Sequence, residues 1–374
     1  MKISKIIFSI IFFIIIFSFF ILNIFIPDKN VSYVENRPLQ QMPEFNMETI
    51  TDGSFMENFE VYTNDQMLLR DTFVNISSGF KRLLGQKEIN NVILGKNNYL
   101  IEKFTKTDLD KERTKINIDF INEFTKKYNN VYFGLIPTAT EILTNKHNWY
   151  PNKVNQTKEI NKIYSELENT DTINITEVLN KHNQEDIFYK TDHHWTTLGS
   201  YYGYIEICKE LNIKPLQLSD FNKEIIDKEF LGTIQSKVNL KTEKDTLYKY
   251  VPKTKQNYEV IISDFPDDIK TDLYFYDKLE SKEKYAVYLG GNNGLVFIKN
   301  KNVPERKLLL IKDSYSHSIV PFLINHYSEI IMVDMRHYLG KIEDLNIEHS
   351  PNEVLILYNL KNFILDRYFV KLNS

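Results

Sequence analysis

From about residue 91 to the C-terminus, short apolar runs alternate with segments in which apolar residues recur at helical spacing. The runs at 131–136 and 307–311 are almost continuously apolar, which is typical of buried strands. Segments of helical spacing lie at 155–167 and 198–211. Strands that alternate with helical connections predict a parallel sheet with right-handed crossovers. We therefore expect an α/β fold in which helices flank the sheet.

The same periodicities place other elements. Further strands are expected at 172–175, 330–333 and 354–357, a hairpin at 92–101, and helices at 109–127, 177–181 and 316–325. Pro321 falls inside the last helix, which is therefore expected to be short or kinked. Short β-like runs occur at 248–251, 258–262 and 273–276. They predict a β-rich insertion at about 212–304, within a domain that covers 91–374.

Residues 6–26 contain no charge and are nearly all Ile, Phe and Leu. A helix of this length spans roughly 30 Å at about 1.5 Å per residue, which is the thickness of a bilayer core. Lys2 and Lys5 precede the run and favour an N-terminus inside and a C-terminus outside. A cleaved signal peptide is the alternative, but 23–27 offers no small-x-small cleavage site. We expect 1–27 to form an uncleaved, single-pass signal anchor in the cell membrane, with the rest outside the cytoplasm.

Residues 28–90 form a different region, in which proline-punctuated extended pieces precede helical apolar spacing from 55 to 76. The net charge is −4 and the pI is about 6.1, so no global field favours nucleic acid as a partner. The chain has one cysteine, Cys208, which excludes an intramolecular disulfide and is expected to be buried.

Two distant stretches carry residues suited to acyl-transfer chemistry. Asp192 lies two residues before His194, and Ser314 follows the apolar run at 308–311 and precedes an expected helix. In an open α/β sheet, this places Ser314 beyond the carboxyl end of a strand, where reactive groups gather. A serine nucleophile, a histidine base and an orienting carboxylate make up a triad. Free N–H groups of the following helical turn are expected to stabilise an oxyanion.

The same residues allow other interpretations. Asp313 and Ser314 are also good helix N-caps, and the Asp-His-His stretch could be a surface loop without a role. Asp-His-His also occurs in metal-dependent phosphoesterases, but no Asp pair stands at the upstream strand ends. We therefore expect no metal and no cofactor. His193 is expected to point away from His194, as neighbours do in an extended segment, and either to be structural or to face the substrate.

Four further residues are candidates for the surroundings of the site. Trp195 is expected to wall the pocket and exclude water. Gly291 and Asn292 lie in a glycine-rich segment that forms either a plain turn or a source of oxyanion donors. Arg336 follows an expected strand and either pairs with Asp334 or binds an anionic sugar or carboxylate.

The stretch 192–195, Asp-His-His-Trp, resembles the motif after which the DHHW family is named. That family is similar to the SGNH-hydrolase-like O-acetyltransferases that modify alginate and other exported polysaccharides. The resemblance extends over most of the chain after the apolar run, at 62–66, 70–71, 95–101, 136–138, 150–151, 192–202, 230–233 and 313–323. In the similar enzymes the Asp and His precede the Ser, as they do here. SGNH-type enzymes commonly have Gly before the Asp-Ser pair, whereas this chain has Lys312.

The resemblance implies an SGNH-like fold, Asp192, His194 and Ser314 as the triad, and O-acyl transfer, in particular acetyl transfer, to a cell-envelope or exported polysaccharide. A membrane-embedded acyltransferase would supply the acyl groups. A polysaccharide deacetylase or esterase, with water as acceptor, is the enzymatic alternative. A non-catalytic protein of an envelope assembly complex, which grips glycan with a tyrosine-rich rim, is the alternative from another class.

Overall fold

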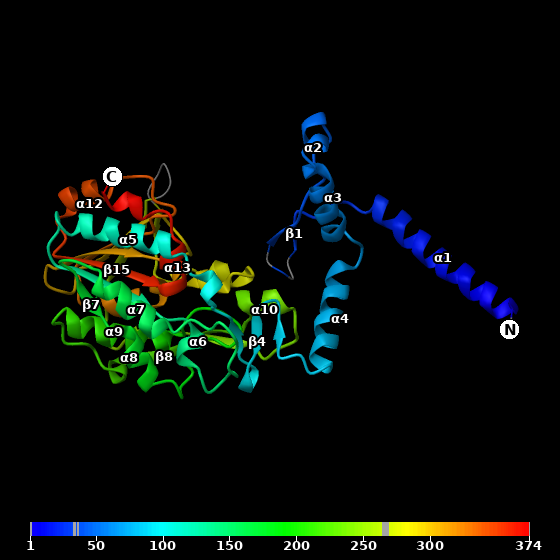
Figure 1. The fold of residues 1–374 in the computed structure, drawn as a ribbon. Helices are drawn as coiled ribbons and strands as arrows, with labels where there is room; N and C mark the ends of the chain where they lie inside the picture. The colour runs from blue at the N-terminus through cyan, green and yellow to red at the C-terminus, as the bar shows by residue number, and fades with distance from the viewer. Residues whose placement is uncertain (1, 33–34, 36, 264–268, 374) are drawn as a thin grey trace. The chain divides into compact units, whose positions relative to one another are not determined.

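The computed structural model describes residues 2–32, 35, 37–263 and 269–373. Side chains are described from residue 6 onward, so those of Lys2 and Lys5, expected to orient the apolar run, lie outside the described part. The chain forms two compact units (Figure 1). The first contains Met1–Ile89 and Ser236–Lys241, and the second contains Asn90–Gln235 and Thr242–Ser374.

The first unit is built from short elements that follow one long helix. Its elements are α1 (Lys2–Phe25), β1 (Val31–Ser32), β2 (Arg37–Pro38), α2 (Met47–Thr51), α3 (Ser54–Asp65), α4 (Arg70–Leu83) and β3 (Glu88–Ile89). Within α1, the stretch Ile6–Phe25 is long and apolar enough to cross a membrane. Signal anchors and signal peptides share these properties.

The helical spacing predicted at 55–76 is interrupted between α3 and α4. Leu69 adopts a left-handed conformation with φ 59°, and α4 begins at the next residue. The bend brings Arg70 against the carboxylates of Glu35, at 2.7 Å, and Asp65, at 3.6 Å. Arg70 is therefore part of a partly buried charge cluster in which Asp65 is the buried member.

The bend between α3 and α4 is tied to the segment that follows α1. Asp65 is buried and accepts hydrogen bonds from the Arg37 guanidinium and from the backbone N–H of Gln40, at 2.9 Å. The Arg37 hydrogen bond outweighs burial and lowers the pKa of Asp65. The Gln66 amide bonds both the N–H and the C=O of Lys29, at 2.9 and 3.0 Å. These polar contacts hold the chain after α1 against the α3–α4 bend.

The second unit contains a central eight-stranded sheet with strand order β11-β10-β12-β14-β13-β15-β6-β7. The strands are β6 (Val131–Ile136), β7 (Asp171–Ile173), β10 (Tyr258–Ile262), β11 (Ile269–Thr271), β12 (Leu295–Asn300), β13 (Lys307–Lys312), β14 (Glu329–Val333) and β15 (Glu353–Asn359). β7, β6, β15, β13 and β14 run parallel, whereas β12, β10 and β11 are antiparallel. The predicted α/β sheet is confirmed, and the insertion contributes its antiparallel edge.

Helices cover both faces of this sheet (Figure 1). One face carries α5 (Lys111–Phe124), α7 (Gln156–Ser165), α12 (Ile342–His349) and α13 (Leu360–Leu365), and the other carries α6 (Ala139–Ile142), α8 (Ile175–Lys181), α9 (Thr197–Glu210) and α11 (Val320–Leu323). In β13, Leu309 and Ile311 pack on the first face, and Leu308 and Leu310 on the second. Burial on both sides explains why this strand is continuously apolar.

The insertion is β-rich, but one of its predicted strands is absent from the described residues. β8 (Phe221–Phe230) and β9 (Asp245–Pro252) form a separate antiparallel pair. The strand predicted at 273–276 is wrong. Leu273 and Phe275 make one backbone hydrogen bond each, with Leu289 and Val287 respectively, and the chain then forms a 3₁₀ helix, Tyr276–Glu280. The hairpin predicted at 92–101 is confirmed as β4 (Val92–Leu94) and β5 (Leu100–Glu102).

Candidate active site

Ser314 lies just beyond the carboxyl end of β13. The chain leaves β13 towards β14 on one side and later returns as β15 on the other, so this end is a topological switch point of the sheet. The buried Asp313 carboxylate caps the following 3₁₀ turn by accepting from the Tyr315 N–H at 2.9 Å. It also accepts from the Asn359 N–H and the Asn362 amide, at 2.8 and 2.7 Å. Asp313 thus holds the strand end rigidly, and Ser314 between two buried neighbours remains partly exposed.

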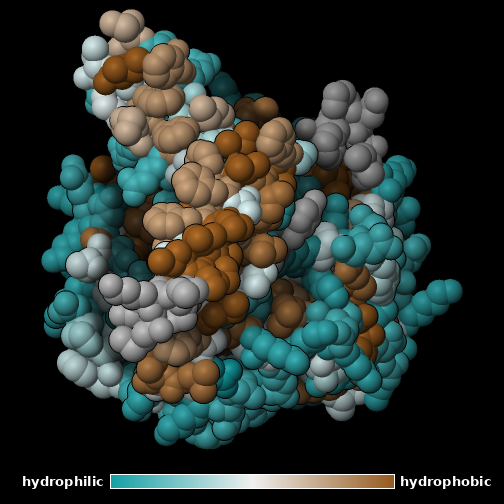
Figure 2. All heavy atoms as spheres, turned by 90° about the vertical axis from the view of Figure 1, so that its right-hand side faces the viewer, coloured by the Kyte–Doolittle hydropathy of each residue, from teal (hydrophilic) through white to brown (hydrophobic). Residues whose placement is uncertain are grey.

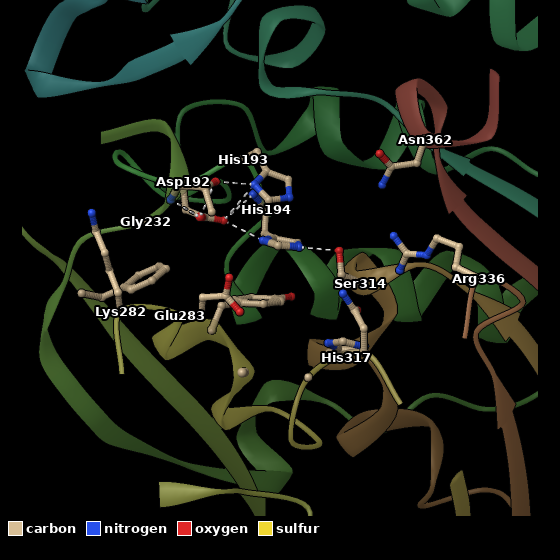
Figure 3. Close-up of a pocket in the computed structure, with 16 residues that line it drawn as sticks. Asp192, His193, His194, Gly232, Lys282, Glu283, Ser314, His317, Arg336 and Asn362 are labelled. Carbon is tan, nitrogen blue, oxygen red and sulfur yellow. Dashed lines mark hydrogen bonds and ion pairs between the residues drawn. The ribbon is translucent and has the colours of Figure 1, made fainter. Parts of the chain in front are cut away.

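Asp192, His194 and Ser314 lie in one hydrogen-bonded line (Figure 3). The distance from His194 Nε2 to Ser314 Oγ is 2.8 Å, and that from His194 Nδ1 to Asp192 Oδ1 is 2.6 Å. A carboxylate can only accept, so Nδ1 carries the proton and Nε2 is left to accept the hydroxyl hydrogen of Ser314. The structure therefore brings together the three residues predicted from two distant stretches.

The environment keeps Asp192 ionised. Burial by itself would raise the pKa of this carboxyl group. The electrostatic influence of His193 and His194 and the hydrogen bonds from His194 outweigh burial and hold the pKa of Asp192 well below its ordinary value. The second carboxylate oxygen accepts from the N–H and hydroxyl of Thr233, at 2.8 and 3.1 Å. An ionised and fully bonded carboxylate fixes the ring of His194 in one orientation.

Aromatic side chains lock the two motifs together. Trp195 Nε1 donates to the carbonyl of Tyr315 at 2.9 Å, and the Tyr315 hydroxyl donates to the carbonyl of His193. Tyr285 stacks on His194, with ring centroids 3.8 Å apart and planes at 8°. The histidine ring is thus held by packing as well as by Asp192.

Two of the sequence-based expectations for this loop are wrong. Trp195 does not wall the pocket, because its ring is fully buried beneath the site, and Tyr285 lines the pocket instead. His193 does not point away from His194, since their ring centroids are 3.8 Å apart. The reason is that the chain bends at this motif and is not extended. His193 Nδ1 lies 2.8 Å from the hydroxyl of Thr233.

The expected source of oxyanion donors also differs. The N–H of Tyr315 donates to the Asp313 side chain, and the N–H of Ser316 donates to the Asp313 carbonyl at 3.3 Å. These groups of the first turn are therefore already engaged. Gly291 and Asn292 line the same pocket as Ser314, and Gly291 adopts φ 100° in the turn.

The pocket has a volume of about 280 Å³. Its lining residues are Asp192, His193, His194, Phe230, Gly232, Thr233, Lys282, Glu283, Tyr285, Ala286, Gly291, Asn292, Ser314, His317, Arg336 and Asn362. Arg336 pairs with Asp334 through two contacts, Nε to Oδ1 at 2.8 Å and Nη2 to Oδ2 at 2.6 Å. The pairing predicted for Arg336 is therefore present.

A buried charge cluster beneath Ser314 was not predicted. Lys312 is fully buried, and its Nζ lies 3.1 Å from Asp334 Oδ2 and 2.8 Å from His317 Nε2. Burial by itself would raise the pKa of Asp334. The positive charges of Lys312 and Arg336 outweigh burial and lower this pKa, so the carboxylate stays ionised. A lysine that ends an apolar strand requires a buried counter-charge, and this was the signal available in the sequence.

The cluster sets the tautomer of His317. Burial and the Lys312 ammonium lower the pKa of His317 well below its ordinary value, so the ring is neutral. An ammonium group can only donate, so Nε2 accepts from Lys312 and the ring proton sits on Nδ1. Among the described residues, Nδ1 has no hydrogen-bond partner, although His317 lines the pocket.

Asp192, His193 and His194 also offer three metal-type ligand atoms within 4.8 Å of one another. Both Nδ1 atoms are already engaged, that of His194 with Asp192 and that of His193 with Thr233. His194 Nε2 is directed at Ser314. The hydrogen bonds therefore account for the geometry of this group.

Gly232 provides a test of how closely Asp192 must be placed. A Cβ atom at this position would lie 2.2 Å from the Cβ of Asp192 and 2.4 Å from its Oδ2. Gly232→Ala is therefore expected to displace the carboxylate and to lower kcat/KM by about 100-fold, as roughly 1 Å misplacements do. Steady-state kinetics on an activated acetyl ester would measure the change. Gly79→Ala is the control, because a Cβ there meets open space; equal activities in both variants would contradict the prediction.

Comparison with known families shows to which family the chain belongs. Residues 90–333 match the DHHW protein family. The chain belongs to this DHHW family. No curated protein shows significant sequence similarity to it.

Solved structures with TM-scores above 0.6 share the fold of this DHHW protein. A DHHW family protein from Eubacterium siraeum is 22% identical, with a TM-score of 0.63, over 76% of this chain and 96% of that one. Bacillus cereus PatB1 with a sulfonyl adduct is 21% identical, with a TM-score of 0.63, over 75% of this chain and 99% of that one. The O-acetyltransferase domain of Pseudomonas putida AlgJ is 12% identical, with a TM-score of 0.47, over 75% and 98%.

Proposed function

We propose that this DHHW protein transfers acyl groups, in particular acetyl groups, to hydroxyl groups of a cell-envelope or exported polysaccharide. The observation that carries the proposal is the line from Asp192 through His194 to a partly exposed Ser314 at the mouth of a pocket. Membership of the DHHW family, together with the resemblance of its motif to that of polysaccharide O-acetyltransferases, supports acyl transfer as the reaction.

In the first half-reaction, Ser314 Oγ attacks the acyl carbon of the donor ester. His194 Nε2 takes the hydroxyl proton, and the Asp192 carboxylate stabilises the imidazolium that forms. The tetrahedral intermediate collapses, the acyl–oxygen bond of the donor breaks, and His194 returns the proton to the leaving alcohol. The product is an acyl ester on Ser314.

In the second half-reaction, a sugar hydroxyl attacks the acyl-serine. His194 accepts the proton of that hydroxyl and then protonates Ser314 Oγ as it leaves. Gly291 and Asn292, which line the pocket, remain our candidates for oxyanion donors, together with the Nδ1–H of His317. No step requires a metal or another cofactor.

The N-terminal helix supports a proposal for the compartment, and the family resemblance supports one for the donor. We propose that α1 is retained as a signal anchor and that the catalytic unit works outside the cytoplasm, where exported polysaccharide is found. A membrane-embedded acyltransferase would then deliver acyl groups to Ser314 from the cytoplasmic side. Arg336 has part of its guanidinium paired with Asp334 and also lines the pocket, so it is our candidate contact for an anionic sugar.

The tyrosines of the insertion offer little support for a purely glycan-gripping role. Tyr250, Tyr285 and Tyr288 are all buried, and Tyr288 donates to the carbonyl of Tyr248. Tyr276 is half exposed. Tyr250 and Tyr288 therefore fill the core and do not present flat faces to a sugar, whereas Tyr285 lines the pocket.

The nucleophile can be tested with a sulfonyl fluoride, because an activated serine attacks the sulfur and expels fluoride. We expect the detergent-solubilised chain to gain the mass of one sulfonyl group and peptide mapping to place it on Ser314. Ser314→Ala should lose the adduct. Ser316→Ala is the matched control, since its buried hydroxyl lies two residues away on the same turn. An adduct that persists in Ser314→Ala would rule out Ser314 as the nucleophile.

The reaction class needs a second measurement on the same samples. A chromogenic acetyl ester is hydrolysed, and candidate glycans are then added as acceptors. We expect acetylated glycan to appear, with faster release of the chromophore. Release that glycans do not alter, without acetylated product, would assign the chain to the esterases.

A further inference from the structure

The α4 helix presents an exposed apolar stripe. Leu69, Phe73, Ile76, Phe80 and Leu83 recur at heptad spacing and are 46–85% exposed. In a helix these positions share one face, whereas Asn75 and Arg82 point roughly 120–140° away from the centre of that face. Figure 2, which views the molecule from the side of α1, shows a band of hydrophobic side chains on this face. A stripe of this size requires an apolar covering.

The position of α4 on α1 indicates what covers the stripe. The rings of Phe19 and Phe73 are in contact, with centroids 6.1 Å apart. At about 1.5 Å rise per residue, Phe19 lies roughly 9 Å before the C-terminal end of α1. If α1 spans the membrane, Phe73 therefore lies within the hydrocarbon layer of the outer leaflet.

The contact between α1 and the α3–α4 bend is built from several interactions. Asn23, a polar side chain in the apolar run, accepts a hydrogen bond from the Leu68 N–H at 2.6 Å. Asp65 and Gln66 tie the bend to the segment that follows α1. An open groove of about 690 Å³ runs between the two helices and is lined by Ile15, Ile16, Phe19, Phe20, Asn23, Met67 and Phe73. Its lining is almost wholly apolar, which suits lipid acyl chains.

We propose that α4 lies in the outer surface of the phospholipid bilayer, with its apolar stripe among the acyl chains. A surface helix buries its apolar face about 5–10 Å below the headgroups, which agrees with the depth inferred for Phe73. Lys81 and Arg82 in the last turn of α4 suit anionic headgroups. The inference rests on the proposed retention of α1 as an anchor.

The test uses the full chain with Cys208 replaced by alanine, so that one introduced cysteine carries a polarity-sensitive fluorophore. The labelled positions are Ile76→Cys and Phe80→Cys on the stripe, Asn75→Cys off the stripe, and Phe12→Cys in the middle of α1. Each variant is reconstituted into vesicles of phosphatidylcholine and phosphatidylglycerol that contain acyl-chain spin labels. We expect the labels at 12, 76 and 80 to lose most of their fluorescence, and the label at 75 to keep it.

Other results would overturn the proposal in distinguishable ways. Quenching of the label at 12 but not of those at 76 and 80 would show that α1 is an anchor and that α4 does not lie in the bilayer. Apolar emission at 76 and 80 without quenching would show that protein covers the stripe. The absence of quenching at 12 would instead refute the anchor itself. Thermal unfolding of each variant checks that the substitutions leave the fold intact.

Discussion

His194→Ala is expected to lower kcat/KM for acyl transfer by about 10⁴- to 10⁶-fold, because triad members act as a unit. His194 Nε2, at 2.8 Å from Ser314 Oγ, is placed to remove the serine proton. Without the ring, Ser314 remains a neutral alcohol and a poor nucleophile. The residual rate would come from oxyanion donors and substrate binding alone. Steady-state kinetics with a chromogenic acetyl ester and a glycan acceptor would measure the loss.

Two further variants distinguish the role of His194 as the base from the roles of its neighbours Asp192 and His193. Asp192→Asn keeps the shape of the side chain but no longer requires the Nδ1–H tautomer, so a loss of about 10⁴-fold is expected. His193→Ala removes a ring that contacts His194 and Thr233, and a much smaller loss is expected, because His194 is the residue that hydrogen-bonds Ser314. If His193→Ala and His194→Ala lost activity equally, the assignment of His194 as the base would fail.

Asp334→Asn is expected to reduce the free energy of unfolding of the second unit by about 3–5 kcal/mol at pH 7. Asp334 neutralises both the fully buried Lys312 and the partly buried Arg336. The amide would leave these two cations close together without a counter-charge, although its shape is the same. Both tryptophans, Trp149 and Trp195, belong to the second unit, so their fluorescence during urea unfolding reports on that unit.

A double-mutant cycle shows whether charge causes the loss. Lys312→Met combined with Asp334→Asn removes the buried ammonium together with the carboxylate, so the double variant should recover part of the stability. Arg336 is partly exposed and can turn towards solvent. A loss below about 1 kcal/mol in Asp334→Asn, the range of exposed ion pairs, would mean that Lys312 is neutral in the folded protein.

The central strands were predictable because burial on both faces leaves a simple pattern. β6, β13, β14 and β15 lie within about two residues of their predicted positions, since each is a short, continuous apolar run. The break between α3 and α4 was not predictable in the same way. A leucine with φ 59° gives no local sign of its conformation, because tertiary contacts of Arg70 and Asp65 select it.

In the candidate site too, local features of the sequence were predictable and tertiary contacts were not. Asp192, His194 and Ser314 were named from spacing, since an Asp two residues from a His and a Ser at a strand end are local features. Their assignment as catalytic residues stays a prediction until the variants are measured. The orientation of His193 was wrong because one extended segment was assumed, whereas contacts with Thr233 and Tyr315 bend the loop.

The amino-acid sequence by itself determined the parallel core, the apolar N-terminal helix and the residue types that acyl transfer needs. Each of these depends on periodicity or spacing over a few residues. Only the tertiary structure decided that His194 hydrogen-bonds Ser314, which lies 120 residues away in the chain, and that Lys312 pairs with Asp334. The same holds for the contact of α4 with α1. These contacts join segments distant in the chain, and their energies depend on burial and charge, which exist only once the sheet and its helices have packed.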